Sequence, residues 1–164
     1  MSPLQDDDKR DLLILDTGPI RELILHHAVF HFGFEKLRDD LQWLTTQASY
    51  SRCSQFIHSF RRRTTSASVV SELNYWIRET DERGQARLWH RAYDEFRGME
   101  VNEEVVPLAA MDIEMVTRFG PVDASLIELA RQHQKERPVV LTIDRGVHGQ
   151  CQKAGFGVRL LQEL

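Results

Sequence analysis

Two short apolar segments of this chain each end in an aspartate. The first is "LLILD", residues 12–16, and the second is "VVLTID", residues 139–144. Apolar runs of this length are typical of strands buried on both faces, as in a parallel sheet. The carboxyl ends of such strands meet at one edge of the sheet, where ligands bind. A buried carboxylate is costly unless it is compensated, so Asp16 and Asp144 either cap the following helices or belong to a site.

Strands and helices are expected to alternate along the rest of the chain. Further strands are predicted over 64–70, 103–108 and 157–161. Apolar residues at helical spacing predict helices after Gly18-Pro19, around 37–44, after residue 70, over 84–98, over 111–119 and from 121 onward. Residues 45–63 are polar and mixed and predict no element. The alternation predicts an α/β fold with a central, mainly parallel sheet flanked by helices.

Length and composition predict one globular domain. The 164 residues suit a single domain over 11–164 behind a polar lead-in, residues 1–10. A net charge of −4 lacks the basic footprint usual for nucleic-acid binding, although a local patch or bound metal could serve instead. The two cysteines form no CxxC pair, and we find neither a membrane-helix pattern nor a signal peptide. A cytoplasmic protein that does not enter membranes is expected.

Two more acids lie near the start of helices that follow crossings of the same sheet. Glu72 lies in "SVVSELNYW", where it leans toward the apolar face of its helix. Asp123 lies in "GPVDASLIELA", on the same face as Leu126, Ile127 and Ala130. Each acid alone is equally explained as a cap, turn or first-turn residue. Together they predict four carboxylates at one edge of the sheet.

Four gathered carboxylates repel one another strongly. At ~4 Å and an effective dielectric of ~20, each close pair costs about 4 kcal/mol. Helix N-termini return only about 0.3–1 kcal/mol each, so protonation or a bound cation must supply the rest. Magnesium or manganese suits an all-carboxylate ligand set and serves phosphoryl transfer.

The same segments resemble the PIN domain, a small three-layer α/β fold of metal-dependent nucleases. "ILDTGPI" is similar to its first strand and first acid, and "SVVSEL" to the segment carrying its glutamate. "GPVDASLIELA" resembles the helix with its third acid, and "VVLTIDRG" with "GFGVRLL" its closing strands and fourth acid. All four motifs occur in the family's order between residues 12 and 161.

The resemblance implies that Asp16, Glu72, Asp123 and Asp144 are the catalytic, metal-binding acids and that Thr142 supports them. It implies a magnesium- or manganese-dependent endoribonuclease that hydrolyses RNA by a metal-activated water. Compact members are often toxins held by a cognate antitoxin (the VapC type), and they commonly form homodimers. Asp16 and Glu72 are 56 residues apart, more than in those compact members, so an enlarged region about 45–63 is expected.

Several alternatives remain beside this reading. Arg61, Arg62 and Arg63 could contact RNA phosphates or simply face solvent. His27 and His31 have zinc spacing, but no HExxH motif completes a site. A non-catalytic PIN-like binding or regulatory module is the main rival function. A phosphatase with a strand-end aspartate nucleophile is the lesser one, because its second aspartate would fall on Gly18.

Overall fold

The computed structural model describes residues 10–80 and 87–164. Five parallel strands form one sheet in the order β3-β2-β1-β4-β5. The strands are β1 (Arg10–Leu15), β2 (Phe60–Ser66), β3 (Val101–Glu104), β4 (Val139–Thr142) and β5 (Gly157–Leu160). The α-helices are α1 (Thr17–His26), α2 (Gln47–His58), α3 (Ala67–Thr80), α4 (Leu88–Met99), α5 (Ile113–Phe119), α6 (Pro121–Gln132) and α7 (Arg145–Lys153). The predicted α/β fold with a parallel sheet flanked by helices is confirmed, and its three layers are consistent with a PIN-like arrangement.

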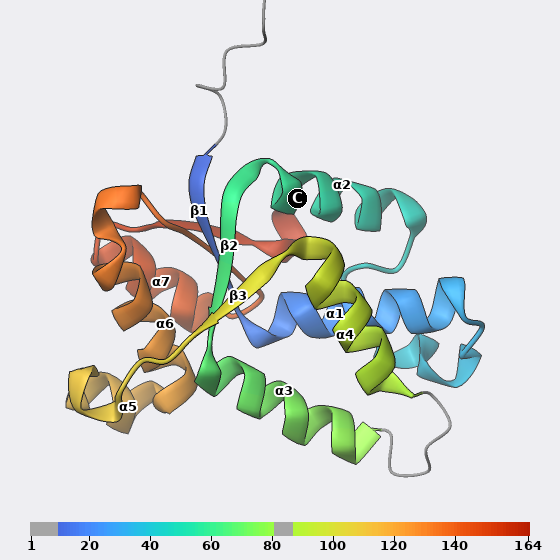
Figure 1. Cartoon of the computed structure of the whole chain (residues 1–164), viewed down its shortest axis with the longest axis horizontal. Helices are drawn as coiled ribbons and strands as arrows, with labels where there is room; N and C mark the ends of the chain where they lie inside the picture. Colours follow the sequence, from blue (N-terminus) through green and yellow to red (C-terminus); the bar gives the residue numbers. More distant parts are fainter. Residues whose placement is uncertain (1–9, 81–86) are drawn as a thin grey trace, which may run out of the picture.

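The central strand β1 explains the fully apolar sequence of its segment. It pairs with β2 on one side and β4 on the other, and Leu12 to Leu15 are fully buried. In Figure 1, α5, α6 and α7 lie to the left of β1 and β2, and α1, α3 and α4 lie to the right. Leu126, Ile127 and Ala130 of α6 are buried, as predicted.

The connections leave β1 in opposite directions. From β1 the chain crosses to β2 and then β3, whereas β4 and β5 are added on the other side of β1. The carboxyl ends of β1 and β4 therefore form the point at which the strand order reverses. In open α/β sheets, this switch point is where ligands bind. Asp16 follows β1 directly and Asp144 begins α7 just after β4.

The helix predicted around 37–44 is wrong. A 3-10 helix, Glu35–Asp40, is followed by extended chain at Leu41. The reason is Glu22 of α1, a fully buried carboxylate that accepts hydrogen bonds from the backbone N–H groups of Gln42, Trp43 and Leu44. These donors are consequently turned toward α1, and the leucine spacing reflects burial of Leu41 and Leu44 in a loop.

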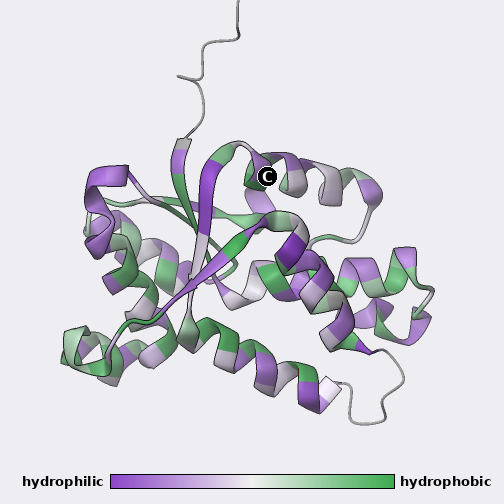
Figure 2. Cartoon of the chain, in the orientation of Figure 1, coloured by the Kyte–Doolittle hydropathy of each residue, from purple (hydrophilic) through white to green (hydrophobic). Residues whose placement is uncertain are grey.

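The region without a predicted element, 45–63, contains all of α2 and the first half of β2. The second strand begins four residues earlier than predicted, at Phe60, and ends at Ser66, where α3 takes over. Figure 2 shows this half of β2 as hydrophilic, because it carries three consecutive arginines. Charge therefore concealed a strand that is paired on both sides, with β1 and β3.

The remaining elements differ mainly at their boundaries. β3 precedes most of the predicted strand 103–108, and β4 and β5 lie within their predicted ranges. The predicted helix 84–98 is α4, although residues 84–86 lie outside the described residues, as does the lead-in 1–9. Within the described part of the chain, no helix is long and apolar enough to cross a membrane.

Candidate active site

All four predicted acids line a single hollow at the carboxyl edge of the sheet. Its volume is about 310 Å³, and Asp16, Glu72, Asp123 and Asp144 enter it from four separate segments. These segments are the β1–α1 junction, the second turn of α3, the first turn of α6 and the N-cap of α7. Asp16 is only 6% exposed, Asp123 is half-buried, and the other two carboxylates are exposed.

Asp16 is fixed on both oxygens. Its Oδ1 accepts a hydrogen bond from the Thr17 backbone N–H at 2.6 Å, which caps α1, and its Oδ2 accepts from the Thr142 hydroxyl at 2.6 Å. Burial, the largest cause, and the charges of Glu72 and Asp144 raise the pKa of Asp16, which is about 6. The bonds from Thr142 and Thr17 act in the opposite direction. Asp16 is therefore both a cap and a member of the acidic cluster.

Neighbouring hydroxyls connect the other acids to Asp16. The Thr17 hydroxyl donates to Glu72 Oε2, which joins α1 to α3. The Thr142 hydroxyl that donates to Asp16 also accepts from the Asp144 backbone N–H at 2.9 Å. Asp144 Oδ1 in turn accepts from the N–H groups of Gly146 and Val147 and caps α7. Thr142 thus lies where the resemblance implied a supporting hydroxyl, between two of the acids.

Asp123 differs from the other three because no hydrogen bond holds its carboxylate in place. The carboxylate has no hydrogen bond or ion pair with another described residue, and its one local role is that of an acid in the first turn of α6, which the helix dipole favours by about 0.3–1 kcal/mol. Burial, the largest cause, and the charges of Asp16, Asp144 and Glu72 together raise the pKa of Asp123 to about 7. A half-buried carboxylate held against three others costs folding free energy, which the helix dipole offsets only in part.

Buried hydroxyl groups connect the elements that carry the acids. The Thr65 hydroxyl donates to the Leu15 carbonyl at 2.7 Å, and the Ser66 and Ser125 hydroxyls are 2.7 Å apart. These contacts join β2 to β1 and to α6, so the segments that carry the acids are fixed relative to one another. Such rigid support is what a preorganised site needs.

Gly18 allows the two aspartate-bearing strand ends to approach each other. A Cβ at this position would lie 2.4 Å from Cγ1 of Ile143, the residue immediately before Asp144. The first turn of α1 therefore packs directly against the β4–α7 connection. Any side chain at residue 18 would force Ile143, the neighbour of Asp144, to shift.

The donor set fits a hard divalent cation. Carboxylate and hydroxyl oxygens surround the hollow, and the raised pKa values of Asp16 and Asp123 mark uncompensated negative charge. Oxygen ligands of this kind suit magnesium or manganese better than zinc. In the described part of the chain, no three His, Cys, Asp or Glu side chains are already arranged to hold a metal ion. The shared hollow and the chemistry of its oxygen atoms are therefore what fits a cation, rather than a preformed coordination geometry.

Six further residues line the hollow, and three of them carry polar side chains that the sequence pattern did not single out: Thr17, Arg21 and Tyr75. Arg21 is the only cationic side chain among the described residues that line it, and its Nε has no hydrogen-bond partner among them. The Arg21 guanidinium carbon lies 5.9 Å from the centre of the Trp76 ring. A usable signal existed, since Tyr75 follows Glu72 by three residues on the same helix.

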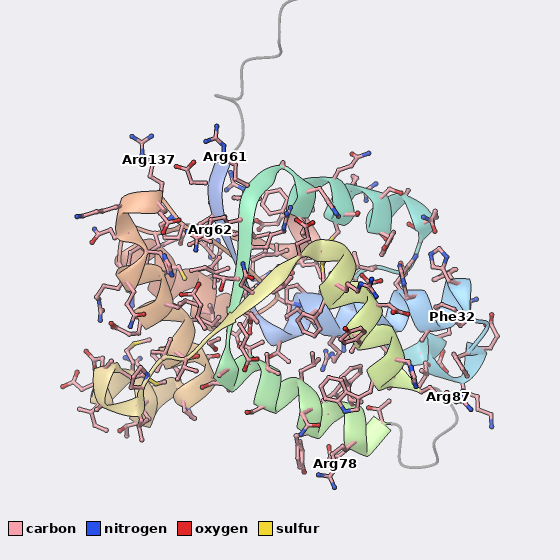
Figure 3. The ribbon with its side chains drawn as sticks, in the orientation of Figure 1. Phe32, Arg61, Arg62, Arg78, Arg87 and Arg137 are labelled. Atoms are coloured by element: carbon pink, nitrogen blue, oxygen red, sulfur yellow. The ribbon has the colours of Figure 1, made fainter. Side chains whose placement is uncertain are left out.

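The three arginines proposed as RNA contacts do not join the acids. They lie in the amino-terminal half of β2, whereas the acids cluster beyond its carboxyl end. Arg62 pairs with Glu136, and Arg63 is buried, with its Nη1 donating to the Phe60 carbonyl at 3.1 Å. Figure 3 places Arg61 and Arg62 at the opposite end of the sheet from α3, so these arginines do not line the acidic hollow, and their contact with RNA stays a prediction.

His27 is fully engaged and leaves no free nitrogen for zinc. Its Nε2 lies 2.7 Å from the Tyr50 hydroxyl, and its Nδ1 lies 2.6 Å from Oε1 of the buried Glu95. His31 contacts the His27 ring at a centroid distance of 4.5 Å. These contacts connect the π-helical turn His27–His31, which follows α1, to α2 and α4, and they account for the histidine spacing structurally.

Comparison with known proteins adds no relative to these observations. No protein-family model matches the chain, and no curated protein matches it. Any functional conclusion consequently depends on the site itself.

Proposed function

We propose that the chain is a magnesium- or manganese-dependent endoribonuclease of the PIN type. The observation that carries the proposal is Asp123, a half-buried carboxylate whose pKa is raised to about 7 by burial and by the other three acids. Capping explains Asp16 and Asp144, but it does not explain why a fourth acid from a different segment faces them. A cation-binding role explains all four.

Each residue has a definable task in such an enzyme. The four acids would hold the metal ion, which when bound activates a water molecule and neutralises charge on the phosphate. Thr142 fixes the positions of Asp16 and Asp144 through the two hydrogen bonds of its hydroxyl. Arg21 provides a positive group in the same hollow for the negatively charged phosphodiester. The choice of RNA as the substrate comes from the resemblance of the four motifs to the PIN family.

The phosphatase alternative is disfavoured by the space around Gly18. That mechanism needs a second aspartate two residues after the first, and a Cβ there would lie 2.4 Å from Ile143. The binding-module alternative does not explain why the fold bears the electrostatic cost of Asp123. A toxin role, with a cognate antitoxin and a homodimer as partners, is the narrower form of our proposal. The ribonuclease activity that this role requires is tested by the same assay.

The test is cleavage of a mixed, structured RNA by the purified protein. Magnesium and manganese are compared with a chelator, and wild type is compared with Asp123→Asn. We expect metal-dependent cutting that falls by at least about 100-fold in the variant, the size of effect that loss of one charge-stabilising group produces. The matched control is Asp40→Asn, which replaces an exposed acid in the 3-10 helix. This variant should cut RNA normally.

Two results would contradict the proposal. Metal-independent cutting that Asp123→Asn leaves unchanged would mean that the acids are not the active site. Neither cutting nor binding of manganese, measured by calorimetry, would favour the binding module instead.

A further inference from the structure

A second hollow lies on α3 beside the acidic one. Its volume is about 440 Å³, and it is lined by Asn74, Tyr75, Arg78 and Glu79. Tyr75 lines this hollow and the acidic hollow as well. Tyr75 therefore borders both hollows, and a ligand that contacts its ring lies next to the acids.

The Tyr75 ring is available to a ligand. It is 65% exposed, while Val69, Leu73 and Ile77 bury the opposite face of α3 against the core. A hydrogen bond to Glu79, one turn further along the helix, raises the pKa of the Tyr75 hydroxyl. The ring is thus oriented by its own helix without being covered.

Positive charge follows the same path. Arg78 is exposed in the second hollow, and Figure 3 shows it projecting from α3. Arg21 lines the acidic hollow, which Tyr75 also lines. An exposed aromatic ring with a guanidinium group in each adjoining hollow matches a strand in which bases alternate with phosphates, since bases stack on aromatic side chains and guanidinium groups pair with phosphates.

We propose that this face of α3 holds the substrate strand next to the cleaved bond, with an unpaired base stacked on Tyr75 and the adjoining phosphate paired with Arg78. The assignment rests on the proposed nuclease function, because it takes the acidic hollow as the place of cleavage. It gives α3 two separable roles: Glu72 serves the metal, and the next turn positions the strand. Stacking of this kind tolerates any base, so the α3 face supplies affinity with little sequence preference.

The test measures binding without cleavage. A fluorescently labelled, unstructured RNA oligonucleotide of mixed sequence is titrated with the Asp144→Asn protein in chelator, and anisotropy is recorded at several salt concentrations. Tyr75→Ala should weaken binding about 10-fold, within the range known for loss of one stacked base. Tyr75→Phe, which keeps the ring, should bind like the parent.

Arg78→Gln should act differently from Tyr75→Ala. Loss of one phosphate contact should reduce the slope of log K against log salt by about 0.7, whereas Tyr75→Ala should leave that slope unchanged. Tyr93→Ala and Arg97→Gln on α4 are matched controls, because Tyr93 is also 65% exposed and neither residue lines either hollow. Both controls should bind like the parent, and thermal midpoints of all variants should be unchanged.

The outcomes separate this inference from the proposed function. If wild type cuts RNA with metal while Tyr75→Ala and Arg78→Gln bind like the parent, the α3 face is wrong and the nuclease assignment stands. Equal losses in Tyr93→Ala and Tyr75→Ala would also overturn it, because the effect would not be local. If the Asp144→Asn protein binds no RNA and wild type cuts none, both ideas fail together.

Discussion

Replacing Asp16 by asparagine should stabilise the metal-free protein at alkaline pH. In the folded protein, burial and neighbouring acids raise the pKa of Asp16 from its ordinary 3.8 to about 6. A rise of this size means that ionised Asp16 costs the fold about 3 kcal/mol relative to the protonated form. Asparagine carries no charge, yet its amide can still accept from the Thr17 N–H and approach Thr142.

The sign of the pH dependence follows from proton binding. Between about pH 4 and pH 6 the folded state holds a proton on Asp16 that the unfolded state has released, so the metal-free wild type loses stability as pH rises through this window. Below about pH 4 both states are protonated and the difference disappears. The advantage of Asp16→Asn should therefore be close to zero at pH 4 and approach about 3 kcal/mol at pH 8.

The assay is thermal unfolding in chelator at both pH values. For a chain of this size, about 3 kcal/mol corresponds to a rise in midpoint of roughly 6–12 °C at pH 8. Excess magnesium should reverse the order, because a bound ion stabilises wild type more than the variant. Asp40→Asn should show neither effect. A pH 8 midpoint for Asp16→Asn at or below that of wild type would refute the clustered-acid reasoning, and so would an equal gain at pH 4.

Three other substitutions test the supports of the site. Gly18→Ala should destabilise by about 1–3 kcal/mol and reduce cleavage, because its Cβ would overlap Ile143; denaturant unfolding and cleavage rates measure the two effects. In Thr142→Val, the loss of stability of the metal-free protein with rising pH should continue to higher pH than in wild type, because the Thr142 hydroxyl lowers the pKa of Asp16. Glu22→Gln should cost about 2–3 kcal/mol in urea unfolding through the loop it holds, while cleavage by the folded fraction stays normal.

The sheet and the four acids were predictable because burial and chemistry coincide in their sequences. β1 and β4 are apolar throughout, so both the strands and the aspartates that follow them are visible in the pattern. Gly120-Pro121 and the apolar spacing that follows predict α6, and the same spacing places Asp123 on the inward face of this helix. These are positions where local and tertiary preferences agree.

Other parts were hidden because tertiary contacts override the local pattern. β2 carries arginines, yet Arg63 is buried because its guanidinium reaches the Phe60 carbonyl and Glu100. The loop after the 3-10 helix exists because Glu22, twenty residues earlier, binds its backbone N–H groups. Tyr75 was missed because an exposed tyrosine does not stand out in a hydrophobic pattern; its spacing of three residues from Glu72 becomes informative only once Glu72 is placed in the acidic hollow.

The four acids also show why a site of this kind resists interpretation from single residues. Asp16 and Asp144 satisfy helix N-termini, so each is consistent with a purely structural role. Asp123 has no hydrogen bond or ion pair among the described residues, and its charge is opposed by burial and by the other three acids. Natural proteins accept such local costs mainly where function requires them. Asp123 therefore indicates a cation site more strongly than the two strand-end aspartates do. Asp123→Asn is the substitution that distinguishes a metal site from a set of helix caps.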